Sequence, residues 1–90
     1  MNTNLNSRGR VYVSSTAVRN AGFRPGQKLA VARTGNKSVE LRPFNQVKRD
    51  SRIASYTVEP TGAVRMSASK IGGTRSGQVT ASRRRVNIQF

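Results

Sequence analysis

Two stretches of this 90-residue chain place the same short elements in the same order, and this repeat limits the folds that the chain can adopt. The stretch 8–44 contains a glycine, a β-rich triplet, two serines, a short helical segment ending in glycine, an "RPGQ" turn and a hairpin. The stretch 61–90 returns to a glycine, a triplet, a serine and an "RSGQ" turn, followed by a shorter hairpin. Ninety residues suit one domain, or two very small ones that share a core. We therefore expect a mostly β fold in which two strand-helix-hairpin copies, with short helical turns, interleave into one small barrel.

The repeat divides the chain into three parts. The first copy is expected over residues 1–44, a polar connector over 45–52 and the second copy over 53–90. A pseudo-twofold axis would relate the two copies. The alternative to a duplication is accidental resemblance, because β proteins punctuated by glycine often look self-similar.

Local signals predict the elements of the first copy. A strand at 10–13 is followed by a helical turn that Ser14 or Ser15 caps and Gly22 ends. Two further strands, at 28–33 and 38–44, are joined by the loop "TGNK". The glycine and asparagine of this loop, Gly35 and Asn36, tolerate the positive φ of a tight hairpin.

The alternation of apolar and polar residues along the strands predicts the core. Truncation of these positions should be costly in so small a domain. The side chains expected to face inward are Val11, Val13, Val31, Leu41, Val58, Val64, Met66, Val86 and Ile88. The aromatic residues are expected in the core or in strand pairs rather than as base-stacking platforms, with Phe44 and Phe90 as core plugs at the ends of their copies.

The charge balance points to a polyanion. Seventeen Lys and Arg residues face three acids, which gives a net charge of +14. Thirteen of the cations are Arg, whose planar fork binds phosphate oxygens and guanine edges bidentately, and this favours nucleic acid. The chain has no segment of about 20 apolar residues, so we expect no membrane association and a cytoplasmic protein.

The residues that most metal sites and enzymes need are scarce. The chain has no Cys and no His, which argues against disulfides, thiolate or imidazole metal ligands and the usual general bases. Three scattered carboxylates, Glu40, Asp50 and Glu59, provide no credible pair of nucleophile and base. We expect no enzymatic activity, no catalytic residue, no cofactor and no metal.

The segment "GRVYVSSTAVRNAGFRPGQKLAV" resembles the AbrB-type swapped-hairpin transcription regulators, the group that includes the MazE-type antitoxins. The resemblance covers residues 8–44, and in weaker form 54–90. It implies a barrel closed by two interleaved hairpins, which one chain would supply here as a monomeric pseudo-dimer. The double-psi barrel has the same sequence rhythm, and a homodimer is the alternative oligomeric state.

The resemblance also implies a DNA-binding face. It comprises the arginine after the first glycine, Arg10, and basic residues in and after the short helix, Arg19 and Arg24. Lys70 and Arg75 occupy the matching positions of the second copy. Three departures from the family pattern are Ala63 in place of the second arginine, Ser14 and Ser15 in place of an apolar residue and proline, and Gln27 and Gln78 in place of aspartate. The first departure makes the second copy a poorer DNA reader.

Further basic residues extend the expected site. The run "SRRR" at 82–85 is predicted in the second hairpin loop, where three guanidiniums could follow a phosphate backbone. Four cations lie on predicted strands or at their ends, and for them a role as edge charges that prevent sheet aggregation is the alternative to nucleic-acid contact: Arg8, Arg33, Arg42 and Arg65. The complete set expected to bind nucleic acid is Arg8, Arg10, Arg19, Arg24, Arg65, Lys70, Arg75, Arg83, Arg84 and Arg85.

Together these features predict a double-stranded DNA-binding protein. It would act as a transcription regulator or a nucleoid-type protein of a prokaryote or phage, associated with the nucleoid. One alternative is an RNA-binding or ribosome-associated protein, since small arginine-rich barrels also serve there. The other is an antitoxin-like or inhibitor-like binder of an acidic protein.

Overall fold

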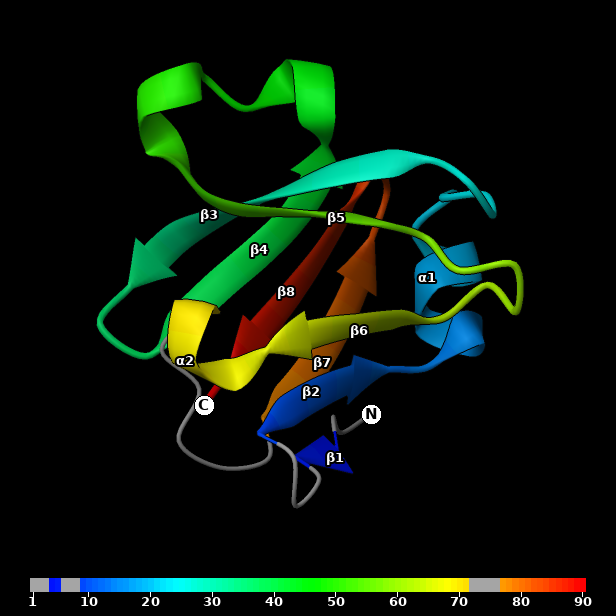
Figure 1. Ribbon diagram of the computed structural model, residues 1–90, viewed down its shortest axis with the longest axis horizontal. Helices are drawn as coiled ribbons and strands as arrows, with labels where there is room; N and C mark the ends of the chain where they lie inside the picture. The colour runs from blue at the N-terminus through cyan, green and yellow to red at the C-terminus, as the bar shows by residue number, and fades with distance from the viewer. Residues whose placement is uncertain (1–3, 6–8, 72–76) are drawn as a thin grey trace.

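The computed structural model describes residues 4–5, 9–71 and 77–90 of the chain (Figure 1). Within these residues the fold is mostly β with two short helices, as predicted, and its strands form two antiparallel sheets. The helices are α1 (Ser15–Asn20) and α2 (Ala68–Ile71), and the 3-10 turns are η1 (Phe44–Gln46) and η2 (Arg49–Ser51). The strands are β1 (Asn4–Leu5), β2 (Arg10–Val13), β3 (Lys28–Gly35), β4 (Ser38–Pro43), β5 (Arg52–Thr57), β6 (Val64–Ser67), β7 (Gln78–Ser82) and β8 (Arg85–Gln89).

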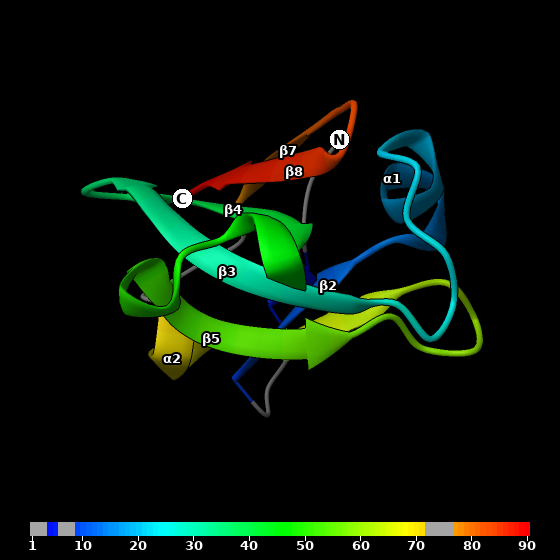
Figure 2. The ribbon, with the colours of Figure 1, turned by 90° about the horizontal axis from the view of Figure 1, so that it is seen from above.

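The two sheets wrap around a common core. The smaller sheet has the strand order β1-β2-β6, and the larger has the order β5-β3-β4-β8-β7. Seen from above, the larger sheet curves strongly, and α1 and α2 lie at opposite sides of the molecule (Figure 2). This arrangement is consistent with a small barrel-like β domain.

Two strand pairs join the halves of the chain, and their registers match the sequence repeat. The repeat makes Val64 the counterpart of Val11, and Met66 the counterpart of Val13. In the β2–β6 pair, Val11 stands opposite Met66, and Val13 stands opposite Val64. Val11 therefore pairs with the counterpart of Val13, and Val13 pairs with the counterpart of Val11. A twofold axis through the pair would generate this register.

The β4–β8 pair follows the same rule. Val39 stands opposite Ile88 and Leu41 opposite Val86, around the central pair of Glu40 and Asn87. The strand order β3-β4-β8-β7 also reads the same from either end when the two halves are exchanged. The outer strands do not follow this symmetry. β1, which precedes β2, pairs with β2, whereas β5, which precedes β6, pairs with β3 and not with β6.

The predicted core is confirmed. All nine predicted residues are at most 1% exposed. They share one cluster with residues that the alternation did not single out, among them Val18, Phe23, Leu29, Val39 and Ile71. Pairing between the halves therefore encloses a single core.

Of the two predicted plugs, only Phe90 packs against the core. Phe44 is half-buried outside it, with Lys28 Nζ 4.1 Å and Arg52 Cζ 3.8 Å from its ring centroid. The difference follows from where β4 ends: the strand stops at Pro43, and Phe44 begins η1, so its side chain no longer follows the alternation of the strand. The prediction for Phe44 is wrong.

Local signals predicted most of the turns. Ser14 caps α1, accepting a hydrogen bond from the backbone N–H of Ala17 at 3.3 Å, and Gly22 follows the helix with φ +85°. The expected positive φ at Gly35 and Asn36 is wrong, because neither residue has a positive φ. Instead, β3 continues through Gly35, and the register of its pairing with β4 shifts between Arg33 and Gly35.

Candidate nucleic-acid interface

The end of α1 is one part of the candidate interface. Ala17, Val18 and Ala21 are buried, which leaves Arg19 on the exposed side of the helix. After Gly22 the chain enters the "RPGQ" turn, in which Arg24 is also exposed.

The turn at Arg24 is held to the barrel by main-chain hydrogen bonds. Gly26, with φ +84°, donates its N–H to the carbonyl oxygen of Val58 at 2.8 Å. Within the turn, the backbone N–H of Arg24 donates to Oε1 of Gln27 at 3.1 Å. The backbone that carries Arg24 is therefore anchored, while its side chain faces solvent.

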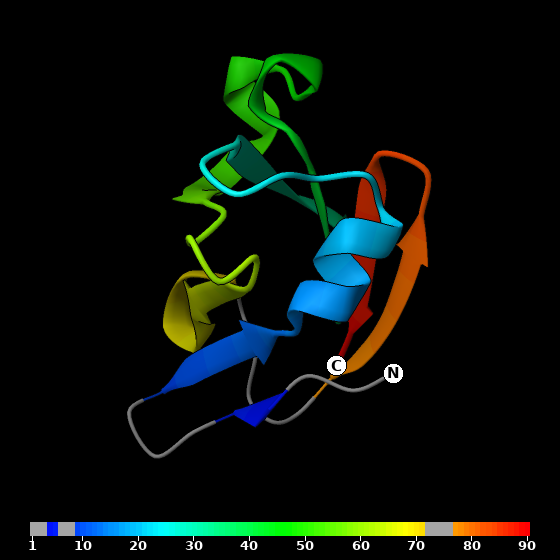
Figure 3. The ribbon, with the colours of Figure 1, turned by 90° about the vertical axis from the view of Figure 1, so that its right-hand side faces the viewer.

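The tip of the β7–β8 hairpin is the second part. Ser82 pairs with Arg85 to close the turn, so Arg83 and Arg84 form its tip, as the sequence predicted. Arg84 has φ +60°, and its backbone N–H donates a 2.9 Å hydrogen bond to the carbonyl oxygen of Ala21 at the end of α1. Figure 3 shows α1 between this hairpin and the loop that precedes β6. We call the exposed residues Arg19, Arg24, Arg83, Arg84 and Arg85 the α1-end cluster.

The α1-end cluster lacks compensating charge. Within the described part of the chain, its five guanidinium groups make no ion pair and no side-chain hydrogen bond. Two of the acids are engaged elsewhere: Glu40 lies 3.6 Å from Arg42, and Glu59 lies 3.2 Å from Arg65. The cluster thus combines like charges at one end of the barrel, where self-repulsion favours an anionic ligand.

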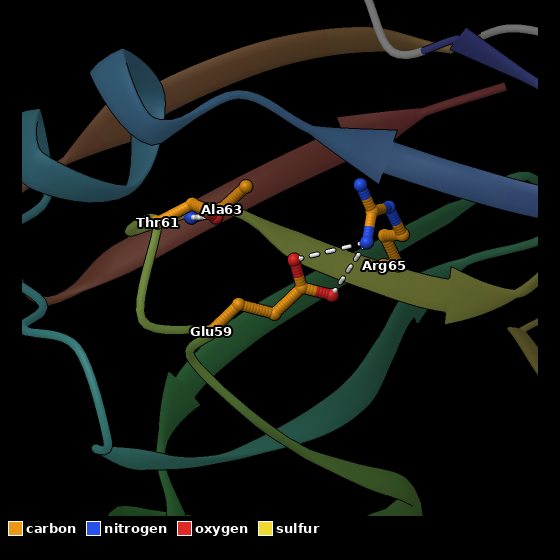
Figure 4. Close-up of polar contacts among 4 residues, drawn as sticks. All are labelled: Glu59, Thr61, Ala63 and Arg65. Carbon is orange, nitrogen blue, oxygen red and sulfur yellow. Dashed lines mark hydrogen bonds and ion pairs between the residues drawn. The ribbon is translucent and has the colours of Figure 1, made fainter.

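The ion pair at Glu59 affects one predicted site residue. Nη1 of Arg65 lies 3.2 and 3.3 Å from the two carboxylate oxygens of Glu59 (Figure 4). Its guanidinium also lies 5.7 Å from the ring centroid of Tyr12. Arg65 is therefore positioned by β2 and β6, and its charge is balanced within the chain.

Arg10 and Lys70 lie apart from the α1-end cluster. Arg10 opens β2, and the carbonyl oxygen of the preceding Gly9 accepts a 2.8 Å hydrogen bond from the backbone N–H of Ala68, the first residue of α2. β2 runs from the α2 side toward α1, so Arg10 and Arg19 do not share one site (Figure 1). Lys70 lies on α2. Arg8 and Arg75 lie outside the described residues.

A hollow of about 330 Å³ opens beside the α1-end cluster. Its lining is drawn from α1, the turn after it and the loop before β6, and comprises Ser15, Arg19, Phe23, Arg24, Pro25, Thr61 and Gly62. The sequence did not predict this feature, since no local pattern indicates that Thr61 and Gly62 lie beside α1. The hairpin-tip and helix arginines were predicted one by one, but not their proximity.

The described residues contain no group of three or more His, Cys, Asp or Glu side chains that could hold a metal ion. Across these same residues, no helix has both the length and the apolar character that crossing a membrane requires. Comparison of the chain with protein-family models, curated proteins and solved structures finds no match. The resemblance to the AbrB-type regulators therefore stays a prediction, and the functional argument depends on the site itself.

Proposed function

We propose that this protein binds double-stranded DNA through the α1-end cluster. The observation that carries the proposal is the hydrogen bond between the Arg84 N–H and the Ala21 carbonyl, which joins two arginine-bearing segments from distant parts of the sequence. Five exposed guanidiniums without an acidic partner in the described chain form a surface suited to phosphate oxygens.

Affinity in this proposal comes mainly from the DNA backbone. Each phosphate that an arginine neutralises releases condensed counterions, so binding is strong at low salt and weakens as salt rises. Arg83, Arg84 and Arg85 would follow the backbone, and Arg19 would reach a base edge in the groove. The biological role that fits is a transcription regulator or nucleoid-type protein acting at the nucleoid.

The decisive experiment compares nucleic acids at matched salt. Fluorescence anisotropy with a duplex DNA, the corresponding single strand and a structured RNA should give the tightest binding to the duplex. Four phosphate contacts, from Arg24, Arg83, Arg84 and Arg85, predict a slope of log K against log salt of about −3.6 for the duplex.

A matched pair of variants locates the interface. Arg83→Gln/Arg84→Gln removes two charges from the cluster, and Lys37→Gln/Lys70→Gln removes two charges from exposed positions outside it. Only the first variant should lower duplex affinity, by tenfold or more. Tighter binding to RNA would instead favour a ribosome-associated role, and absence of nucleic-acid binding with capture of an acidic protein would favour an inhibitor-like role.

A further inference from the structure

The hollow beside the α1-end cluster has two chemically different zones. The apolar part of its lining, which we call the floor, comprises Phe23, which is 4% exposed, Pro25 and Gly62. The polar and positive part, which we call the rim, comprises the residues Arg19, Arg24, Ser15 and Thr61. A ligand that fits both zones must carry an anionic group and a less polar body.

The walls of the hollow are fixed by backbone interactions. Gly62 has φ +89°, and a Cβ at this position would come within 3.2 Å of Cβ of Ser15, so a glycine is needed where the loop approaches α1. Two backbone hydrogen bonds close the loop on itself: the Glu59 N–H donates to the Ala63 oxygen at 2.9 Å, and the Gly62 N–H donates to the Glu59 oxygen at 2.8 Å. The hydroxyl of Thr61 accepts a 3.5 Å bond from the Ala63 N–H and keeps its own proton for a ligand (Figure 4).

We propose that this hollow binds one nucleotide unit, with its phosphate between Arg19 and Arg24 and its sugar or base against Phe23, Pro25 and Gly62. The volume of about 330 Å³ lies at the lower end of the range for small-molecule sites, roughly 300 to 1,000 Å³, which suits one nucleotide rather than several. Two guanidiniums can bind the oxygens of one phosphate with charge-assisted hydrogen bonds.

The nucleotide must be unpaired. A base inside a duplex is stacked on both sides, and extracting it costs a few kcal/mol. The same chemistry is available from two sources, an unpaired nucleotide at a strand end or gap and a free nucleoside monophosphate. The first source rests on the proposed function, whereas the second does not.

NMR titration of the whole protein with adenosine 5′-monophosphate tests the hollow directly. We expect saturable shifts of the backbone amides of Ser15, Phe23 and Gly62 at ligand concentrations up to about 10 mM, the range of weak single-site binding. Arg19→Gln/Arg24→Gln should weaken this binding at least tenfold. The charge-matched Arg83→Gln/Arg84→Gln variant should change it less than twofold. Absence of saturable shifts in the wild-type protein would overturn the proposal.

Two additional ligands separate the contributions of the phosphate and the body. Inorganic phosphate should bind more weakly than the nucleotide, because it leaves the apolar floor empty, and adenosine should bind more weakly still because it lacks the anion. Arg19→Lys/Arg24→Lys should restore part of the affinity by charge but not the bidentate geometry. Equal binding of phosphate and nucleotide would overturn the role of the floor.

A third measurement distinguishes the two sources. If the occupant belongs to a strand, a duplex with a 5′-phosphorylated overhang should bind at least fivefold more tightly than a blunt duplex, and Arg19→Gln/Arg24→Gln should abolish this preference. Equal duplex affinities together with saturable nucleotide binding assign the hollow to a free nucleotide. If the protein binds the duplex but shows neither the overhang preference nor saturable nucleotide binding, the nucleotide site in the hollow is overturned and the proposed function stands. If the protein binds the nucleotide but not the duplex, only the proposed function is overturned.

Discussion

The backbone N–H of Arg84 donates a 2.9 Å hydrogen bond to the carbonyl oxygen of Ala21, which fixes the tip of the second hairpin against the end of the first helix. The donor is the main chain, so the guanidinium is not needed for the link. A cation next to the carbonyl end of a helix is also electrostatically favourable. The hydrogen bond thus fixes the hairpin against α1 and also places the positive charge of Arg84 at the end of this helix.

Substitutions at Arg84 should separate the structural role of the backbone from the charge. Arg84→Gly keeps the N–H and removes the cost of the positive φ, so stability should stay within about 1 kcal/mol. Arg84→Pro lacks the N–H and cannot adopt φ +60°, so it should lose at least about 2 kcal/mol. Thermal or urea unfolding measures both values. Equal stabilities would contradict the importance of the link to Ala21.

The two arginines at the hairpin tip and Arg85 beside them should act only through phosphate. Alanine at Arg83, Arg84 or Arg85 should weaken all duplex sequences alike and make the salt slope shallower by about 0.9 per residue. Anisotropy titrations of two unrelated duplexes over a salt series provide the measurement. A sequence-dependent loss would show that these side chains reach base edges instead.

Arg10 and Arg19 are the two arginines expected to read bases, but only Arg19 belongs to the α1-end cluster, so most of their joint effect on duplex binding should come from Arg19. Replacing both by Ala should weaken binding at least tenfold, about 1.4 kcal/mol, at moderate salt. Each single variant should then reveal which side reads bases, since loss of a bidentate guanine contact removes roughly 1 to 3 kcal/mol of discrimination. If the double variant melts normally and binds within twofold of the wild type, the DNA-binding face lies elsewhere.

Leu41 and Ile88 should be essential to stability, as both are fully buried in the central strand pair. Truncation of either to Ala should cost about 2 to 5 kcal/mol. Ile53, which is 38% exposed, is the matched control, and Ile53→Ala should cost about 1 kcal/mol or less. Unchanged melting of the Leu41 and Ile88 variants would contradict the core assignment.

The chain should be monomeric. Both cross-half strand pairs, β2–β6 and β4–β8, form within one chain, so no second copy is required to complete the core. Sedimentation equilibrium should give the monomer mass of 9.8 kDa across a wide concentration range. A concentration-independent mass of twice that value would support the homodimer alternative.

Features of the fold that depend on neighbouring residues could be predicted from the sequence. The helix that begins after Ser14 follows from a capping side chain and a C-terminal glycine, and the burial of Val11 and Val13 follows from period-two alternation. The error at Phe44 arises because the expected strand over 38–44 ends one residue earlier, at Pro43, and Phe44 starts a 3-10 turn. The alternation therefore predicts burial only for residues that lie within a strand.

The candidate site depended on contacts that no local pattern encodes. The backbone of Arg84 is hydrogen-bonded to Ala21, and Gly62 packs closely against Ser15, although the residues of each pair are far apart in the sequence. Such contacts follow from how the two halves cross, and the sequence repeat indicated the crossing without its register. The arginines could be named individually, whereas their common surface and the hollow beside them required the fold.

The crossed pairing has a consequence for how the two halves can differ. In a homodimer with a strict twofold axis, a residue on the axis faces its own copy, so Glu40 would meet a second carboxylate and like charges directly opposite destabilise a sheet. In this chain Glu40 faces Asn87, and Arg65 faces Tyr12, whose ring lies 5.7 Å from the guanidinium. Because the two halves belong to one chain, the two residues that face each other at an axial position need not be identical. Each can therefore be chemically different from the residue opposite it.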